Sequence, residues 1–162
     1  MYTFYADIVE PKRKEYNMTY ISELDKIINA AASHGIYTFL DMHQDVISEK
    51  YCGEGVPAWA AESLILRDNK LFPSPIDDPF TDVATDGFPT RQDCAKHSWN
   101  KYYNTNAAAE AFESLYTNRT NLLSAWGEMW AKFAKELGSS NIIGYELINE
   151  PYVIVIVCIL FF

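Results

Sequence analysis

The sequence predicts an α/β fold built from parallel strands, and three observations lead to this prediction. Residues 36–43 and 141–149 are rich in β-branched and aromatic side chains, as strands buried on both faces are. Each follows a long amphipathic helix that closes at a glycine, which is the order of repeated helix–strand units. No glycine-rich phosphate-binding fingerprint follows a predicted strand, so part of a (β/α)8 barrel is favoured over a nucleotide-binding sheet.

The first elements are a short strand and a long helix. Residues 2–9 are rich in Tyr, Phe, Ile and Val and predict a strand. Residues 19–34 predict a helix, which Asn17 or Thr19 can cap and which Gly35 can close in a left-handed conformation. Apolar residues at helical spacing define its buried face: Ile21, Leu24, Ile27, Ile28 and Ala31.

The later elements follow a long interruption. Residues 45–106 lack periodicity and contain five prolines, which predicts an extended loop region of the functional kind, with short helices around 59–66. Residues 107–137 predict a helix that is broken near Asn118, and the strand of 141–149 follows it. The apolar stripe of this helical region consists of Phe112, Leu115, Leu122, Trp126, Trp130, Phe133 and Leu137.

Composition limits the classes of partner. The formal net charge of -9 disfavours nucleic acid and anionic membranes as charge-driven partners. The hydrophobic fraction of 49% argues against disorder. Aromatic residues form 15% of the chain, and they indicate either an aromatic core or a cleft for carbohydrate or lipid.

Cysteines and glycosylation sequons bear on the compartment. Cys52 and Cys94 lie in the long loop region and can pair in an oxidising compartment or remain free, whereas Cys158 has no evident partner. The sequons at 17–19 and 118–120 favour a secretory or lysosomal setting.

The two ends of the chain do not match a targeting segment. Residues 1–17 lack the charged and apolar regions of a signal peptide. Residues 152–162 form an almost unbroken apolar tail, about half of the roughly 20 residues that a membrane-spanning helix needs. The tail therefore predicts a buried strand or an aggregation-prone end.

Polar residues gather where the predicted strands end, which is where catalytic groups lie in parallel α/β folds. Asp41, His43 and Asp45 alternate, so we expect them to share one face. Asn149 and Glu150 stand at the tip of the last predicted strand. This arrangement predicts a site at one edge of the sheet.

Some of these residues also have a structural interpretation. Asp41 can be a strand-end acid bonded to the backbone, and His43 can be a satisfied core histidine. Glu146 lies too early in its strand to reach the tip, so we expect an interior structural acid there.

The chemistry that this set suggests is glycoside cleavage. One carboxylic acid protonates the leaving oxygen while a second carboxylate attacks the sugar or activates water. Glu150 is the candidate acid/base, and Asn149 beside it can bond a sugar hydroxyl. His43 and Asp45 can hold further hydroxyls, which both donate and accept hydrogen bonds.

Three segments, GIYTFLDMHQD, GEGVPAWA and NIIGYELINEP, resemble the retaining glycosidases of glycoside hydrolase family 5, a cellulase-like family, and within it the endoglycoceramidases. The resemblance covers residues 9–151 and implies about strands two to four of a (β/α)8 barrel. It implies that Glu150 is the acid/base, Asn149 its companion, and His43 and Asp45 sugar-binding residues. It implies no metal or cofactor, and a glycolipid or oligosaccharide substrate with peripheral contact to membrane lipid.

The sequence also departs from the family's pattern. The family's nucleophile is a second Glu near the end of the barrel, and no Asp or Glu follows Glu150 here. We expect residues 1–151 to be a partial barrel domain, residues 152–162 to be unrelated to it, and the chain to be an N-terminal and central fragment that is inactive alone. A β-glucan hydrolase of the same family and an inactive, truncated or sugar-binding remnant are the alternatives.

Overall fold

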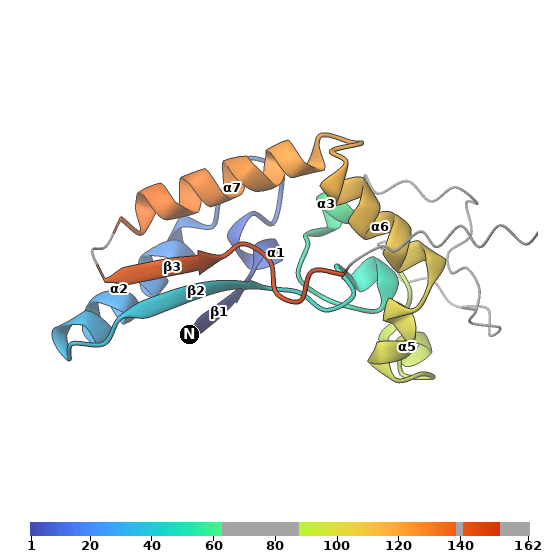
Figure 1. Cartoon of the computed structure of the whole chain (residues 1–162), viewed down its shortest axis with the longest axis horizontal. Helices are drawn as coiled ribbons and strands as arrows, with labels where there is room; N and C mark the ends of the chain where they lie inside the picture. The colour runs from blue at the N-terminus through green and yellow to red at the C-terminus, as the bar shows by residue number, and fades with distance from the viewer. Residues whose placement is uncertain (63–87, 139–140, 153–162) are drawn as a thin grey trace, which may run out of the picture.

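A computed structural model describes residues 1–62, 88–138 and 141–152 of the chain. These residues form one parallel sheet of three strands in the order β1-β2-β3, as Figure 1 shows. An α/β fold with a parallel sheet is what part of a (β/α)8 barrel requires, so the predicted fold class is confirmed. The strands are β1 (Tyr2–Tyr5), β2 (Thr38–His43) and β3 (Ile142–Glu146).

The first strand is shorter than residues 2–9. After β1 the chain turns into a single helical turn, α1 (Ala6–Val9), in which Ala6 and Val9 are both buried. Residues three apart on a helix lie on the same face, so this turn places both in the core. The amide of Asp7 donates to the carbonyl of Gly55 at 3.1 Å, which ties the turn to a loop that is distant in sequence. The prediction of a strand over residues 6–9 is therefore wrong.

Helix α2 (Met18–Ser33) matches its prediction closely. The Asn17 side chain accepts a hydrogen bond from the Tyr20 amide at 3.1 Å, and Gly35 is left-handed with φ of 72°. The predicted stripe is wrong at Ile27, which is 49% exposed. The buried residues of the helix are Ile21, Leu24 and Ile28.

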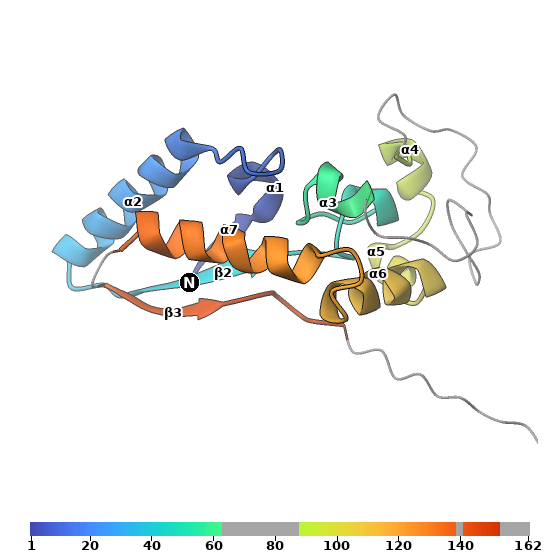
Figure 2. The ribbon, with the colours of Figure 1, turned by 90° about the horizontal axis from the view of Figure 1, so that it is seen from above.

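The main core lies between the sheet and two helices. Figure 2 shows α2 and α7 (Leu122–Glu136) on the same face of the sheet. Strand β2 is buried on both faces from Leu40 to Met42, as predicted, although residues 36 and 37 are exposed and precede the strand. The largest fully buried side chains of this core are Phe4, Phe133, Ile21, Leu24, Ile28, Leu40 and Met42.

The long loop region folds around a second core, formed by residues such as Tyr51, Tyr102, Phe112 and Leu115. The predicted helix near residues 59–66 is confirmed as α3, and its part beyond residue 62 lies outside the described residues. Cys52 and Cys94 form a disulfide with 5.3 Å between their Cα atoms. The short helices of this region are η1 (Glu49–Tyr51), α3 (Ala58–Glu62), α4 (Arg91–Cys94) and α5 (Trp99–Tyr103).

The predicted break near Asn118 is confirmed, because helix α6 (Asn106–Tyr116) ends there and α7 begins at Leu122. Asn118 and Asn121 both have positive φ, of 52° and 61°, which a continuous helix does not allow. Among the described residues, no helix is both long and apolar enough to cross a membrane. Cys158 and the apolar tail beyond residue 152 lie outside the described residues.

Strand β3 is not buried on both faces, contrary to prediction. Ile143, Tyr145 and Leu147 are 67%, 39% and 52% exposed. Tyr145 pairs with the buried Leu40 of β2 and its ring contacts Trp130 of α7, so α7 covers this face of β3 only in part. These side chains are exposed because β3 is an edge strand of the described sheet.

Candidate active site at the carboxyl ends of the strands

His43 stands between two carboxylates at the end of β2. Its Nδ1 lies 3.2 Å from Asp41 Oδ2, and its Nε2 lies 3.6 Å from Asp45 Oδ2. The three residues share one face, as their alternation predicts. Asp41 is fully buried, and its bond goes to the imidazole. A carboxylate in this position fixes the orientation of the ring.

Gln44 connects the ends of β2 and β3, and sequence reasoning missed it. The side chain is fully buried; its Nε2 donates to the Asn149 carbonyl at 2.7 Å, and its Oε1 accepts from the Ile47 amide at 2.8 Å. The available signal was its place between His43 and Asp45, directly after β2, where continued alternation points it to the opposite face. A buried amide at such a point is expected to bond backbone groups.

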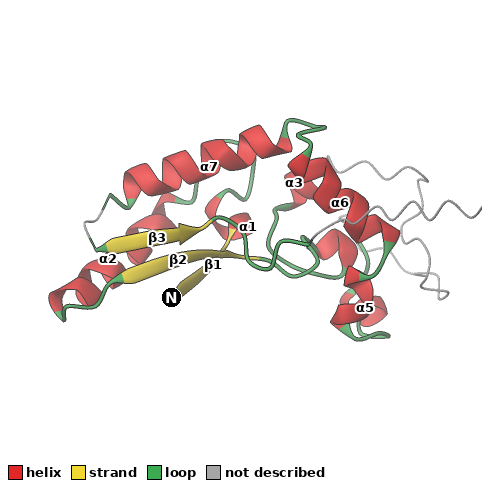
Figure 3. Ribbon diagram, in the orientation of Figure 1, coloured by secondary structure: helices red, strands yellow, loops and turns green. Residues whose placement is uncertain are grey.

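Asn149 continues the pairing of the two strands beyond β3. Its amide donates to the Met42 carbonyl at 2.9 Å, and its Nδ2 lies 3.4 Å from the Gln44 carbonyl. Figure 3 shows the two segments that follow β2 and β3 running together. The predicted groups from the two strands are therefore brought to the same place. Glu146 pairs with Asp41 in register and is half-buried within the sheet, as an interior acid should be.

Glu150 follows directly, with an exposed side chain and a left-handed backbone of φ 41°. Its negative charge acts on Asp45, whose pKa is raised above its ordinary value. Burial is the largest cause of that raised pKa; the charges of Glu54 and Glu150 add to it, while His43 opposes it. The structure thus groups all four predicted site residues: His43, Asp45, Asn149 and Glu150.

Tyr103 is a further member of this group that the sequence did not reveal. Its hydroxyl accepts a hydrogen bond from Gln44 Nε2 at 3.3 Å. Burial raises the pKa of its hydroxyl, and the charges of Asp45 and Glu150 raise it further. Tyr103 comes from α5, within the region that lacks periodicity, so no pattern in the sequence places it here.

A loop of residues 52–55 closes the site from one side. Asp45 and Glu54 form an antiparallel bridge, with N···O distances of 3.0 and 2.7 Å, and Glu54 Oε1 accepts a hydrogen bond from the Tyr5 hydroxyl at 3.0 Å. Ligand atoms of His43, Asp45 and Glu54 all lie within 4.8 Å of one another. This spacing suits sugar hydroxyls, and one cation could also contact all three groups.

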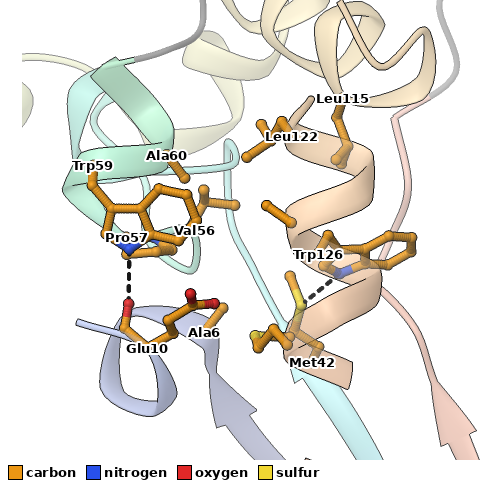
Figure 4. Close-up of a pocket in the computed structure, with 12 residues that line it drawn as sticks. Ala6, Glu10, Met42, Val56, Pro57, Trp59, Ala60, Leu115, Leu122 and Trp126 are labelled. Carbon is orange, nitrogen blue, oxygen red and sulfur yellow. Dashed lines mark hydrogen bonds between the residues drawn. The ribbon is translucent and has the colours of Figure 1, made fainter. Parts of the chain in front are cut away.

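A small apolar pocket lies behind the site, and Figure 4 shows its walls. Two indoles donate hydrogen bonds within its opposite walls, from Trp59 Nε1 to the Glu10 carbonyl at 2.9 Å and from Trp126 Nε1 to Met42 Sδ at 3.1 Å. Its volume of about 30 Å³ is far too small for a sugar. The indoles instead fix α3 and α7 against α1 and β2, beneath the candidate site.

Comparison with known proteins agrees with this architecture. Residues 2–154 match the model of the family described as Cellulase (glycosyl hydrolase family 5). Endoglycoceramidases of Hydra vulgaris and Cyanea nozakii are both 48% identical to the chain over 143 residues. These matches cover 88% of the chain but only 27% and 28% of the two relatives, so the chain spans about a quarter of their length.

Solved structures show the same fold. Endo-glycoceramidase II from Rhodococcus sp. gives a TM-score of 0.67 in its iminocyclitol complex and 0.66 in its ganglioside GM3 complex, at 23% identity. The matches cover 93% of this chain and 30% or 31% of those chains. The family match spans nearly the whole chain, and the chain therefore belongs to glycosyl hydrolase family 5.

Proposed function

We propose that this chain carries the proton-donating part of a glycosidase site that releases the glycan of glycosphingolipids from ceramide. The observation that carries the proposal is the joining of the ends of β2 and β3: the Asn149 amide bonds the Met42 carbonyl at 2.9 Å, and Gln44 Nε2 lies 3.3 Å from the Glu150 carbonyl. This places Glu150 beside the segment that carries His43 and Asp45. The names of the relatives support the substrate class, since two of them are endoglycoceramidases and a solved neighbour is described with ganglioside GM3.

In this proposal each residue has one role. Glu150 donates a proton to the leaving oxygen and then takes one from the attacking water. Asn149, His43 and Asp45 hold sugar hydroxyls beside the reacting carbon. The second carboxylate of a retaining reaction attacks that carbon, and no Asp or Glu follows Glu150 in this sequence. We therefore expect the 162-residue chain alone to release no ceramide from a fluorescent ganglioside.

A chimeric enzyme tests the role of Glu150. The matching segment of the Hydra vulgaris endoglycoceramidase is replaced by this chain's residues 2–151, which the 48% identity makes feasible. The chimera should release ceramide from a fluorescent ganglioside, and Glu150→Gln should lower kcat by about 100-fold or more. Glu23→Gln, on the exposed side of α2, is the matched control. An active Glu150→Gln chimera would remove Glu150 from the proposed role.

A β-glucan is the second candidate substrate, because the matched family is described as cellulase. The same chimera, with lactosylceramide and cellotetraose compared at equal concentration, separates the two. The proposal expects a higher kcat/KM for the glycolipid, and the opposite ranking would favour the β-glucan.

We also propose a secreted or lysosomal setting, with peripheral contact to the lipid that carries the substrate. The Cys52–Cys94 disulfide supports an oxidising compartment. Mass spectrometry of the protein from its own cells tests this, by looking for glycan on Asn17 or Asn118. An unmodified protein with reduced cysteines would contradict it.

A further inference from the structure

Three side chains that can bind a metal ion converge beside the end of β2. Ligand atoms of His43, Asp45 and Glu54 all lie within 4.8 Å of one another, and His43 Nε2 is 3.6 Å from Asp45 Oδ2. Two ligands of a tetrahedral Zn²⁺ ion, each bound at about 2.0–2.2 Å, are separated by roughly 3.4 Å. His43 and Asp45 therefore have the spacing that one ion requires, and rotation of the exposed Glu54 side chain closes the remaining distance.

The other ring nitrogen of His43 is held from behind. Nδ1 lies 3.2 Å from Asp41 Oδ2, and the Tyr5 ring packs edge-on against the imidazole with 5.6 Å between the ring centroids. A carboxylate that accepts a hydrogen bond from one ring nitrogen fixes the tautomer in which the other nitrogen has a free lone pair. Metal-binding histidines in proteins almost always make such an outer contact. His43 Nε2 is therefore oriented to bind a metal on the side of Asp45.

Asp41 gives an independent indication of a cation. Its side chain is fully buried, and its Oδ1 has no hydrogen-bond partner among the residues that the structure describes. Buried charges in proteins are paired or bind metals. A neutral imidazole gives Asp41 a hydrogen bond but no positive charge, whereas an imidazole bound to Zn²⁺ carries part of the charge of the ion. A cation on His43 Nε2 would thus stabilise the buried carboxylate through the ring.

The two carboxylates are placed by their main chains. Asp45 and Glu54 exchange backbone hydrogen bonds of 3.0 and 2.7 Å, and Glu54 Oε1 accepts a hydrogen bond from the Tyr5 hydroxyl at 3.0 Å. A Cβ on Gly53 would overlap the Asp45 carbonyl, and Gly55 has φ of 123°, so this close approach requires glycine at both positions. The ligands are therefore ordered before an ion binds, which lowers the entropy cost of binding.

We propose that His43, Asp45 and Glu54 bind one Zn²⁺ ion and that this ion inhibits the candidate active site. Asp41 and Tyr5 act as positioning residues behind the ligands. One imidazole and two carboxylates suit Zn²⁺ better than Ca²⁺ or Mg²⁺, which prefer a larger number of oxygen ligands. Binding of the ion is independent of the proposed function. Inhibition rests on that function, because the ion occupies the groups that are proposed to hold sugar hydroxyls.

Isothermal titration of the 162-residue chain with zinc chloride tests the binding. Every protein of this series carries Cys158→Ser, because a thiolate also binds zinc. We expect one ion per chain at micromolar concentration. Loss of an outer contact alone weakens metal binding about 10–100-fold, so Glu54→Gln, which removes a ligand, should weaken it at least as much. Glu23→Gln, on the exposed side of α2, should leave the affinity unchanged, and magnesium chloride should not bind.

Two further variants test the groups that position the ligands. Tyr5→Phe removes the hydroxyl that holds Glu54 but keeps the ring that packs on His43, and it should weaken Zn²⁺ binding about tenfold. The double substitution Cys52→Ser and Cys94→Ser releases the loop from α4 and should also weaken binding. The visible spectrum of bound Co²⁺ reports the geometry of its ligands. It should shift in both variants, whereas a loss of stability alone would leave it unchanged.

The chimeric enzyme tests the inhibition. Zn²⁺ should raise the KM for the fluorescent ganglioside and leave kcat unchanged, because the ion and the sugar compete for His43 and Asp45. In the Glu54→Gln chimera the same rise in KM should require about tenfold more Zn²⁺ or greater. Removal of the ion with a chelator should restore the original KM. Zinc titration of the chimera repeats the binding comparison in a full-length enzyme.

The outcomes separate this inference from the proposed function. If Zn²⁺ does not bind, or binds Glu54→Gln as tightly as the parent chain, the metal site is overturned while the proposed function stands. If the chimera is inactive without Zn²⁺, the proposed function and the inhibition fail, while the titrations still decide the metal site. If Zn²⁺ binds but lowers kcat and leaves KM unchanged, the competition with sugar is overturned. Unchanged affinity in Tyr5→Phe or in the double substitution overturns the positioning role of that group.

Discussion

The side-chain amides of Gln44 and Asn149 each contact the main-chain carbonyl of the other residue. Gln44 Nε2 donates to the Asn149 carbonyl at 2.7 Å, and Asn149 Nδ2 approaches the Gln44 carbonyl at 3.4 Å. The two residues lie 105 positions apart in sequence and end neighbouring strands. This reciprocal contact sets the distance between the residues that follow β2 and Glu150. The geometry of the candidate site therefore depends on Gln44, a buried side chain with no assigned contact to the substrate.

Replacement of Gln44 by methionine should destabilise the chain. The change keeps the length of the side chain but leaves the buried Ile47 amide and the Asn149 carbonyl without these partners, at a cost of about 1–3 kcal/mol. Urea unfolding measures the loss. Gln92→Met, on the exposed side of α4, is the control and should change stability by less than about 0.5 kcal/mol. Equal effects of the two changes would refute the structural role of Gln44.

Alanine at Gly53 and at Gly127 should have opposite effects. At Gly53 the new Cβ meets the Asp45 carbonyl, and we expect a loss of about 1–3 kcal/mol. Gly127 lies inside α7 with no atom within 4 Å of an added Cβ, so alanine should stabilise the helix by about 0.5–1 kcal/mol. Thermal unfolding followed by circular dichroism measures both changes in stability. A neutral Gly53→Ala variant would show that the loop can move away from β2.

Leu24 and Ile27 provide a matched pair on α2. Leu24 is 1% exposed and Ile27 is 49% exposed, although their spacing in the sequence gives them the same expected burial. Leu24→Ala should cost about 2–5 kcal/mol, because it leaves a cavity in the main core. Ile27→Ala should cost well under 1 kcal/mol, as surface changes do. Chemical denaturation of both variants decides whether this face of the helix is oriented as described.

Protonation of Asp45 should begin at a higher pH than that of an ordinary aspartate. Burial and the nearby charges of Glu54 and Glu150 raise its pKa, so binding that needs its carboxylate should weaken early as pH falls. A raised pKa in the folded state means that the ionised form is disfavoured by folding. Ionisation of Asp45 therefore lowers stability as pH rises above the unfolded pKa, and protonation restores it as pH falls.

Carbon-13 NMR titration of the Asp45 carboxyl measures this pKa directly. Glu54→Gln removes a neighbouring negative charge and should lower the Asp45 pKa, whereas Glu23→Gln should leave it in place. An Asp45 pKa that is indifferent to Glu54 would mean that the two carboxylates are farther apart than described.

Loss of the disulfide should lower the free energy of unfolding by about 4 kcal/mol, according to the chain-entropy relation for its sequence separation of 42. The double serine variant and the reduced chain should agree, because both remove the same constraint from the unfolded state. Urea unfolding of the oxidised chain, the reduced chain and the variant provides the comparison. A reduced chain as stable as the oxidised one would speak against the cross-link seen here.

Local patterns in the sequence predict much of this fold. Strand alternation predicts that Asp41, His43 and Asp45 share a face, and helical spacing predicts α2, which Asn17 caps, and the helical region that breaks near Asn118. Burial is less predictable, since it depends on neighbours that are remote in sequence. Ile27 and Ile143 have the local signature of core residues, but the surrounding elements leave both exposed.

The site residues that the sequence did not reveal were missed for the same physical reason. Gln44 is recognised only through its partner 105 residues away, and Glu54 only through the loop that returns to β2. Tyr103 reaches the site from a short helix in a region without periodicity. Contacts of this kind are made by tertiary folding and leave no repeat in the chain.

The bridge between Asp45 and Glu54 uses only main-chain atoms, and the glycines on either side of Glu54 permit its close approach. A segment held in this way keeps its course when its outward side chain is exchanged. Position 54 can therefore vary over evolutionary time while Asp45 stays where it is. The side chain beside His43 and Asp45 can thus be exchanged while the main chain of the site keeps its course.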